Sequence, residues 1–203
     1  MAKTLRIIDL FAGLGGLRIG FTQAAQSFGI ETECVFTSEI KPAAVRAYQK
    51  NFPGETITGD ITQVSAEDIP AFDVLLAGFP CQPFSSAGKG LGFVDTRGTL
   101  FFDIERILSH HRPRAFVLEN VEGLVTHDRQ DKSEPIGNTL KVILSKLEEL
   151  EYKVNWKVFD ASEYGLPQKR KRIYITGVKD NHVNFEGFTV SRKPLSEVLE
   201  RRP

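Results

Sequence analysis

Residues 5–17 read LRIIDLFAGLGGL, an apolar run that ends in a cluster of glycines. The run from Leu5 to Asp9 has the composition of a buried strand, and the glycines from Gly13 to Gly16 interrupt it before helical spacing begins. Glycines in such a turn let a ligand approach the backbone closely. The stretch therefore predicts a strand, a tight glycine turn and a helix, with a nucleotide-like ligand at the turn.

The alternation of apolar runs and helical spacing continues along the chain. Strands are expected over residues 33–38, 55–58, 72–77, 115–119, 154–159 and 172–178, and helices over 42–51, 100–110 and 136–150. This order favours an α/β fold with a doubly wound, mostly parallel sheet, whose ligand site lies at the carboxyl ends of the strands. Residues 78–98 are a long loop rich in Gly, Pro and Ser, and loops of that length are usually functional.

The composition is that of one intracellular domain. With 203 residues, 41% of them hydrophobic, the chain is long enough for one core, and we expect a single domain over residues 1–203. The 26 basic residues balance 26 acidic ones, which neither indicates a polyanion partner nor excludes a local basic groove. There is no apolar run of about 20 residues and no signal peptide, so we expect a cytoplasmic protein without a membrane span. The two cysteines, Cys34 and Cys81, should be free thiols there.

The glycine turn departs from the dinucleotide fingerprint G-x-G-x-x-G. Counted from Gly13, the third glycine would stand at position 18, where the chain has Arg18. A nicotinamide dehydrogenase is therefore disfavoured. Glu39 follows the next strand about 20 residues after the turn, where an acid that binds ribose hydroxyls is expected, and Asp60 could hold an adenine amino group. The alternative is that the glycines only make a turn and the acids only cap helices.

Cys81 stands in the sequence GFPCQPFS, residues 78–85, between two prolines that restrict the backbone around it. A lone cysteine is usually an inert small hydrophobe, but this one begins a polar loop after a strand. We interpret Cys81 as a functional thiol. Cys34, which lies inside an expected strand, is interpreted as a core residue.

Two more polar motifs flank expected strands, one at the end of the fifth strand and the other at the opening of the last. Residues 119–121 read ENV, and residues 168–172 read QKRKR. Acidic and amide groups at a strand end can bind the edge of a base, and arginines suit phosphate or carbonyl oxygens. Alone, each motif could equally be a helix cap or a solvated basic face, but their combination is more specific.

In this order, the blocks at residues 9–21, 79–85, 119–121 and 168–172 resemble those of the cytosine-5 DNA methyltransferase family. The resemblance implies a Rossmann-like, S-adenosylmethionine-dependent methyltransferase fold, S-adenosylmethionine as methyl donor, no metal, and duplex DNA as substrate in a restriction-modification system. It also implies a donor pocket in which Glu39 binds the ribose, Asp60 and Ile61 flank the adenine, and Leu100 closes the site. The other expected donor-site residues are Phe11, Gly13, Gly15 and Pro80.

The resemblance further implies how the reaction proceeds. Cys81 adds to carbon 6 of a cytosine flipped out of the duplex, which makes carbon 5 nucleophilic toward the donor methyl. Glu119 hydrogen-bonds ring nitrogen 3 and the exocyclic amine, and Asn120 braces the local backbone. Arg172 holds the carbonyl oxygen of the base, and Arg170 supports the site or a nearby phosphate.

The family pattern continues after the arginine motif with a recognition region and two further blocks, which residues 1–203 lack. We therefore expect no target-recognition region here, which leaves a two-chain enzyme, a fragment of a longer protein or a degenerate gene. An RNA cytosine-5 methyltransferase and a catalytically silent subunit remain alternatives. An adenine amino-methyltransferase is disfavoured, because it uses an Asp/Asn-Pro-Pro-aromatic stretch where residues 79–82 read FPCQ. The loop over residues 82–98 is expected to close over the base.

Overall fold

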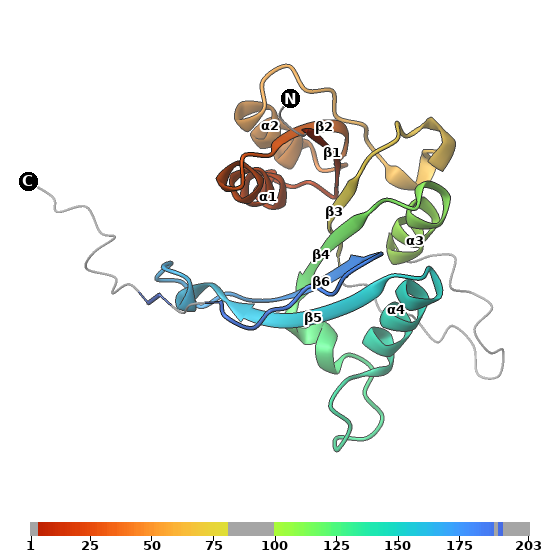
Figure 1. Ribbon diagram of the computed structural model, residues 1–203, viewed down its shortest axis with the longest axis vertical. Helices are drawn as coiled ribbons and strands as arrows, with labels where there is room; N and C mark the ends of the chain where they lie inside the picture. The colour runs from red at the N-terminus through yellow and green to blue at the C-terminus, as the bar shows by residue number, and fades with distance from the viewer. Residues whose placement is uncertain (1–3, 81–99, 189–190, 193–203) are drawn as a thin grey trace, which may run out of the picture.

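In the computed structural model, which describes residues 4–80, 100–188 and 191–192, one sheet of six strands runs through the molecule (Figure 1). The strand order is β2-β1-β3-β4-β6-β5. The strands are β1 (Thr4–Leu10), β2 (Glu31–Ser38), β3 (Val74–Gly78), β4 (Ala115–Val121), β5 (Lys153–Asp160) and β6 (Lys171–Val178). The helices are α1 (Gly16–Ser27), α2 (Pro42–Asn51), α3 (Leu100–His111) and α4 (Asn138–Glu149).

The direction of the strands gathers the polar motifs at one edge of the sheet. Strands β2, β1, β3 and β4 are parallel, so their carboxyl ends meet at this edge. β6 is antiparallel to β4, and β5 is antiparallel to β6. The start of β6 therefore lies beside the end of β4, where Val121 faces Arg172. The expected parallel sheet is confirmed for four strands, and the antiparallel pair carries the arginine motif to the same edge.

Helices cover both faces of the sheet, as a doubly wound fold requires. On one face, Ile7, Val74 and Leu76 pack against Leu17 and Phe21 of α1. The opposite face carries the larger core, to which α3 and α4 contribute apolar residues at helical spacing, Ile104, Ile107, Leu108, Leu140, Ile143 and Leu147. None of the helices within the described ranges is long and apolar enough to cross a membrane.

Some expected boundaries differ from the observed ones. Residues 55–58 are not the expected strand, because only Thr58 pairs with β2, through a single bridge to Ser38. The helix expected from residue 136 begins at Asn138, because Gly137 bonds back to the carbonyl of Val125 at 2.7 Å. Apart from its first three residues, the expected long loop over residues 78–98, with Cys81, lies outside the described residues.

Candidate active site

The glycine turn follows β1 in an unusual backbone conformation. Phe11, Gly13 and Gly15 have φ angles of 53°, 56° and 82°. A left-handed conformation is readily adopted by glycine but is uncommon for a phenylalanine, and such outliers concentrate at functional sites. The Ala12 amide donates to the Ser38 carbonyl at 3.1 Å, which ties the turn to the end of β2.

Glu39, directly after β2, fixes the turn through its carboxylate. Its Oε2 accepts the Gly13 amide at 2.8 Å, and its Oε1 accepts the Lys41 amide at 2.8 Å. The residue is only 8% exposed. Because each carboxylate oxygen can accept a second hydrogen bond, the side chain retains capacity for hydroxyl donors. The structure therefore brings Glu39 and the glycine turn together.

Two large apolar side chains flank this contact in an exposed position. Leu14 in the turn and Ile40 after Glu39 are each 61% exposed. Ile40 is not among the residues predicted from the sequence. Its signal is an apolar residue directly after a strand-end acid, where a surface position would normally be polar. Exposed apolar side chains beside the glycine turn suit contact with the face of a flat ring.

The remaining expected donor residues lie at or near the same edge in different environments. Asp60 is the N-cap of a short 3-10 helix over Ile61–Gln63, and its Oδ1 accepts both the amide and the hydroxyl of Thr62, at 3.0 and 2.8 Å. Ile61 is buried in the core at 2% exposure. Pro80 is exposed just after β3, and Leu100 begins α3 and is half-buried. Their donor contacts stay predictions.

Glu119 and Arg172 form an ion pair between β4 and β6. Arg172 Nε lies 2.8 Å from Glu119 Oε1, and both side chains are about one-fifth exposed, at 23% and 22%. Val121 of β4 pairs directly with Arg172 of β6, and Glu119 stands two residues before Val121. Side chains two residues apart in a strand point to the same face, so Glu119 and Arg172 lie on the same face of the sheet. Arg172 Nη1 also donates to the Lys171 carbonyl at 2.8 Å. Antiparallel pairing thus joins two motifs that are far apart in sequence.

The end of β3 lies between the glycine turn and Glu119. A Cβ atom placed on Gly78 would lie 3.4 Å from Glu119 Oε2 and 3.9 Å from the Phe11 carbonyl oxygen. Asn120, 2% exposed, donates from Nδ2 to the Phe79 carbonyl at 3.0 Å, and its Oδ1 accepts the Val121 amide at 2.8 Å. Asn120 therefore braces β3 against β4 two residues before Cys81, as expected.

The arginine motif lines a groove beside this pair. The groove is formed by Val121, Glu122, Gly123, Asp160 and residues 168–172. Lys171 pairs with Glu122 at 3.2 Å, whereas the exposed guanidinium of Arg170 has no ion pair within the described ranges. Hydrogen bonds, first from the Ser162 amide, lower the pKa of Asp160. An accessible guanidinium here suits a phosphate.

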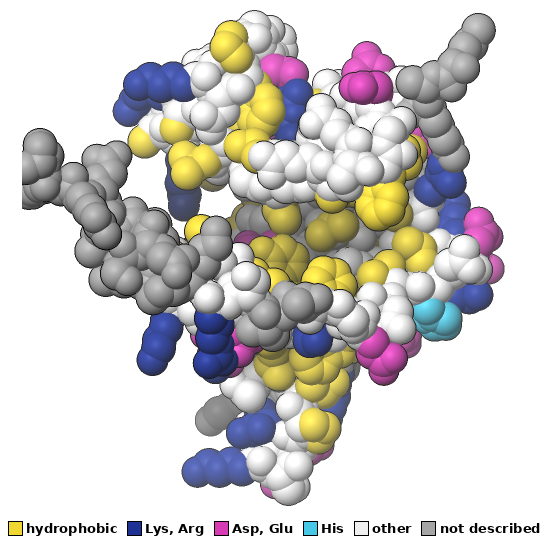
Figure 2. All heavy atoms as spheres, turned by 60° about the vertical axis from the view of Figure 1, so that its left-hand side comes forward, with side chains coloured by type: hydrophobic (Ala, Val, Ile, Leu, Met, Phe, Trp, Pro, Cys, Tyr) yellow, Lys and Arg dark blue, Asp and Glu magenta, His cyan; other side chains and the backbone are white. Residues whose placement is uncertain are grey.

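Figure 2 brings this side of the molecule toward the viewer. A hollow crosses the face, hydrophobic side chains line it, and lysine and arginine side chains lie along its lower side. An apolar recess with cationic groups at its margin fits a flat heterocycle whose phosphates remain outside.

The comparisons with known proteins agree with this geometry. The family model C-5 cytosine-specific DNA methylase matches residues 5–201. The Type II methyltransferase M.NgoBV of Neisseria gonorrhoeae is 56% identical over 98% of this chain and 47% of its own length. M.HaeII of Haemophilus aegyptius is 52% identical over 98% of this chain and 58% of its own. The chain thus spans about half the length of these relatives.

A solved structure supports the same assignment. The crystal structure of a prophage-encoded E. coli protein, named as a DNA modification methyltransferase, superposes with a TM-score of 0.70 and 26% identity, over 94% of this chain and 52% of that one. The family match includes the glycine turn, Glu119 and the arginine motif, which the fold gathers at one edge. The chain therefore belongs to the C-5 cytosine-specific DNA methylase family.

Proposed function

We propose that this chain carries the donor-binding and catalytic part of a cytoplasmic restriction-modification enzyme that methylates carbon 5 of a flipped cytosine in duplex DNA. The observation that carries the proposal is the meeting of three segments around Gly78. A Cβ atom placed there would lie 3.4 Å from Glu119 Oε2 and 3.9 Å from the Phe11 carbonyl oxygen, and Glu119 is paired with Arg172. The description of the family and the name of the prophage-encoded protein support DNA as the substrate. Residues 1–203 act as one domain, and recognition of a DNA sequence comes from further polypeptide, in a second chain or in the same one.

The donor is S-adenosylmethionine, which supplies an electrophilic methyl group on a sulfonium. Glu39 accepts hydrogen bonds from the ribose hydroxyls with the lone pairs that Gly13 and Lys41 leave free. Ile40 offers its exposed side chain to one face of the adenine. Asp60, whose Oδ1 is already bonded to Thr62, uses Oδ2 for the adenine amino group.

The reaction begins with the Cys81 thiolate, which bonds to carbon 6 of the base. Nitrogen 3 takes a proton as the sulfur adds, and Glu119 stabilises this protonated ring by accepting hydrogen bonds from nitrogen 3 and the exocyclic amine. The resulting enamine makes carbon 5 nucleophilic. Carbon 5 attacks the methyl group of the donor, whose bond to sulfur breaks and leaves S-adenosylhomocysteine. Carbon 5 then loses its proton to solvent, and the electron pair of that bond expels the Cys81 thiolate from carbon 6.

Arg172 serves both the carboxylate and the base. Its Nε bonds Glu119 and its Nη1 bonds the Lys171 carbonyl, while Nη2 has no partner in the described part of the chain. A guanidinium has five donor hydrogens in a fixed plane, so Nη2 can donate to the carbonyl oxygen of the base while Nε keeps Glu119 oriented. The guanidinium of Arg170 binds a neighbouring phosphate of the DNA.

The test is a covalent trap. The purified chain is incubated with tritiated S-adenosylmethionine and mixed-sequence duplex DNA that contains 5-fluorocytosine, with and without cell extract. Fluorine cannot leave carbon 5 as a proton does, so the adduct through Cys81 persists and carries the tritiated methyl group. We expect a labelled complex that survives denaturation.

Cys81→Ser is the control and should abolish the complex. A complex that forms only with extract supports a recognition partner in a second chain. A labelled complex with structured RNA but none with DNA would replace the proposal by RNA methylation. No complex under any condition would contradict the proposed activity of residues 1–203 and favour an inactive fragment or a catalytically silent subunit.

A further inference from the structure

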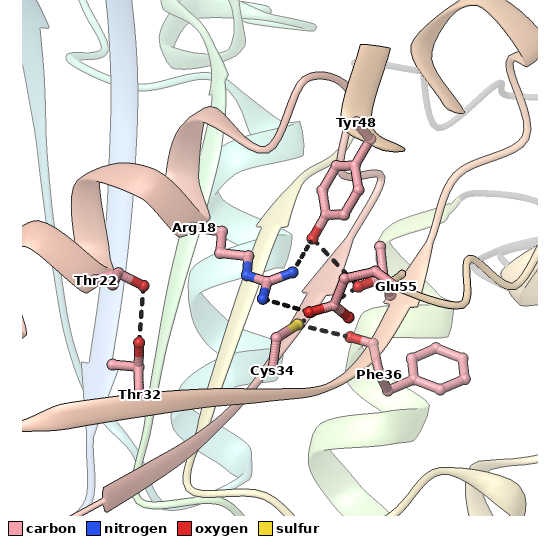
Figure 3. A network of polar contacts seen from close by, with 8 residues as sticks. Arg18, Thr22, Thr32, Cys34, Phe36, Tyr48 and Glu55 are labelled. Atoms are coloured by element: carbon pink, nitrogen blue, oxygen red, sulfur yellow. Dashed lines mark hydrogen bonds and ion pairs between the residues drawn. The ribbon is translucent and has the colours of Figure 1, made fainter. Parts of the chain in front are cut away.

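A polar and aromatic network, which the proposed chemistry does not use, lies beside the glycine turn (Figure 3). At its centre is Arg18 of α1, whose Nη1 donates to the Tyr48 hydroxyl at 2.9 Å and whose Nη2 donates to Glu55 Oε1 at 2.7 Å. The guanidinium carbon also lies 3.9 Å from the centre of the Phe52 ring. The Arg18 side chain is 12% exposed, so it is a largely buried cation with three partners.

The partners of Arg18 are the residues on which the turn rests. A Cβ atom on Gly15 would lie 2.3 Å from Phe52 Cε2 and 3.0 Å from Tyr48 Cε2, so both rings contact the Gly15 backbone. Next to them, Asn51 Nδ2 donates to the Leu14 carbonyl at 2.8 Å. The end of α2 therefore touches two successive residues of the turn.

The network is also connected to the sheet. The Tyr48 hydroxyl lies 3.2 Å from Thr37 Oγ1 in β2, and Thr37 Oγ1 lies 3.4 Å from Cys34 Sγ. Burial lowers the pKa of Arg18, but hydrogen bonds to Glu55 and Tyr48 raise it more, so its charge is retained. Charge-assisted bonds of this kind are stronger than neutral ones and hold their partners in fixed positions.

We propose that Arg18 is a positioning residue of the donor site, which holds Tyr48 and Phe52 against Gly15 and so keeps residues 13–15 in the conformation that binds S-adenosylmethionine. The inference rests on the proposed function. Arg18 acts through the two rings and does not touch the donor, because its side chain extends toward α2 and Glu55 (Figure 3). It also gives a physical role to the arginine at position 18.

The test compares two Arg18 variants with a matched control in the full chain. Arg18→Met removes the charge and both hydrogen bonds, and Arg18→Lys keeps the charge without the planar fork. The control is Arg112→Met, because Arg112 donates to the Leu150 carbonyl at 2.7 Å and lies 3.7 Å from Glu151, away from the turn. Affinity for S-adenosylhomocysteine is measured by calorimetry well below each unfolding midpoint, with affinity for duplex DNA measured alongside.

Arg18→Met should weaken S-adenosylhomocysteine binding about tenfold or more, the scale of losing one charge-assisted hydrogen bond, with DNA affinity unchanged. Arg18→Lys should restore part of the affinity. Arg112→Met should lower the unfolding midpoint without changing affinity, which separates positioning from general destabilisation.

Equal S-adenosylhomocysteine affinity in Arg18→Met and the unsubstituted chain would overturn the inference and leave the proposed function intact. Failure of the unsubstituted chain to bind would instead contradict its proposed donor use, and the inference with it. If both Arg18 variants are unfolded, Glu55→Gln decides, because it removes only the carboxylate partner of Arg18. Unchanged affinity in that variant would overturn the inference.

Discussion

Asp9 is buried in β1 close to the Arg18 network, at 1% exposure, and its Oδ2 has no hydrogen-bond partner in the described part of the chain. Burial raises the pKa of Asp9 from 3.8 to about 7, against the opposing effects of Tyr48 and Arg18. The folded chain therefore keeps a proton that the unfolded chain loses above about pH 4. The contribution of Asp9 to stability is full below this pH and falls by about 1.4 kcal/mol per pH unit until pH 7.

Asp9→Asn should remove this pH dependence while keeping the shape of the side chain. We expect the unfolding free energy of the variant to exceed that of the unsubstituted chain at pH 8, and the difference to shrink as the pH falls toward 4. Urea unfolding of both proteins across this pH range measures the difference in unfolding free energy. Asp180→Asn, at an exposed position, removes the same charge and is the control. A constant difference at all pH values would show that Asp9 titrates normally.

Glu119→Gln tests the carboxylate at the reacting edge. The amide keeps the shape but loses the ion pair with Arg172 and the negative charge that we propose stabilises the protonated ring. Methyl transfer in a single turnover should slow about a hundredfold or more, the scale of losing one such group. Duplex affinity should change little. If the variant instead bound S-adenosylhomocysteine weakly and transferred at the normal rate, Glu119 would belong to the donor site.

At the scale of elements, the packing of β6 on β4 depends on a glycine. Gly177 faces Phe116, and a Cβ atom there would lie 2.2 Å from Phe116 Cζ, inside the core. Gly177→Ala should destabilise the chain by about 1–3 kcal/mol through overpacking. Gly20→Ala, on the exposed side of α1 with no atom near the new Cβ, should stabilise it by roughly 0.5–1 kcal/mol. Urea unfolding of both variants checks the opposite signs.

The elements themselves were largely predictable because their periodicity is local. The helix over residues 42–51 was confirmed at both ends, since Pro42 suits the first helical position and Phe52 leaves the helical conformation. The strand expected over residues 55–58 was wrong, because four residues of alternating character are too few to distinguish a strand from a single bridge. The antiparallel direction of β6 could not be predicted, since the side-chain period of a strand is the same in either direction.

At the scale of the whole molecule, the sequence predicted the motifs but not their contacts. That Glu119 and the glycine turn share one edge followed from fold class. Arg172 reaches this edge only because β6 is antiparallel to β4, and the 2.8 Å pair depends on the β4–β6 register. In the sequence, Arg18 stands out only because the dinucleotide fingerprint would have glycine at this position. Its proposed role depends on Tyr48 in α2 and on Phe52 directly after that helix. Contacts between elements of this kind leave no local sequence signal.

The proposed function assigns donor binding to the glycine turn with Glu39, and the bond to the base to Cys81. Unfolding of the whole chain can test this division. S-adenosylhomocysteine at a hundredfold its Kd should stabilise the folded chain by about 2.7 kcal/mol. At roughly 2–4 °C per kcal/mol for a chain of this size, the unfolding midpoint should rise by roughly 5–10 °C. Cys81→Ser should keep the full rise.

The Glu39→Gln variant should lose most of the rise in unfolding midpoint that S-adenosylhomocysteine produces. The Gly13 and Lys41 amides both need an acceptor, and a glutamine amide offers one oxygen and a competing donor where the carboxylate offers two oxygens. Glu31→Gln, at the exposed start of β2, should behave like the unsubstituted chain. A rise that disappears in Cys81→Ser but persists in Glu39→Gln would reverse the two assignments, because donor binding would then depend on the loop that carries Cys81 rather than on the turn.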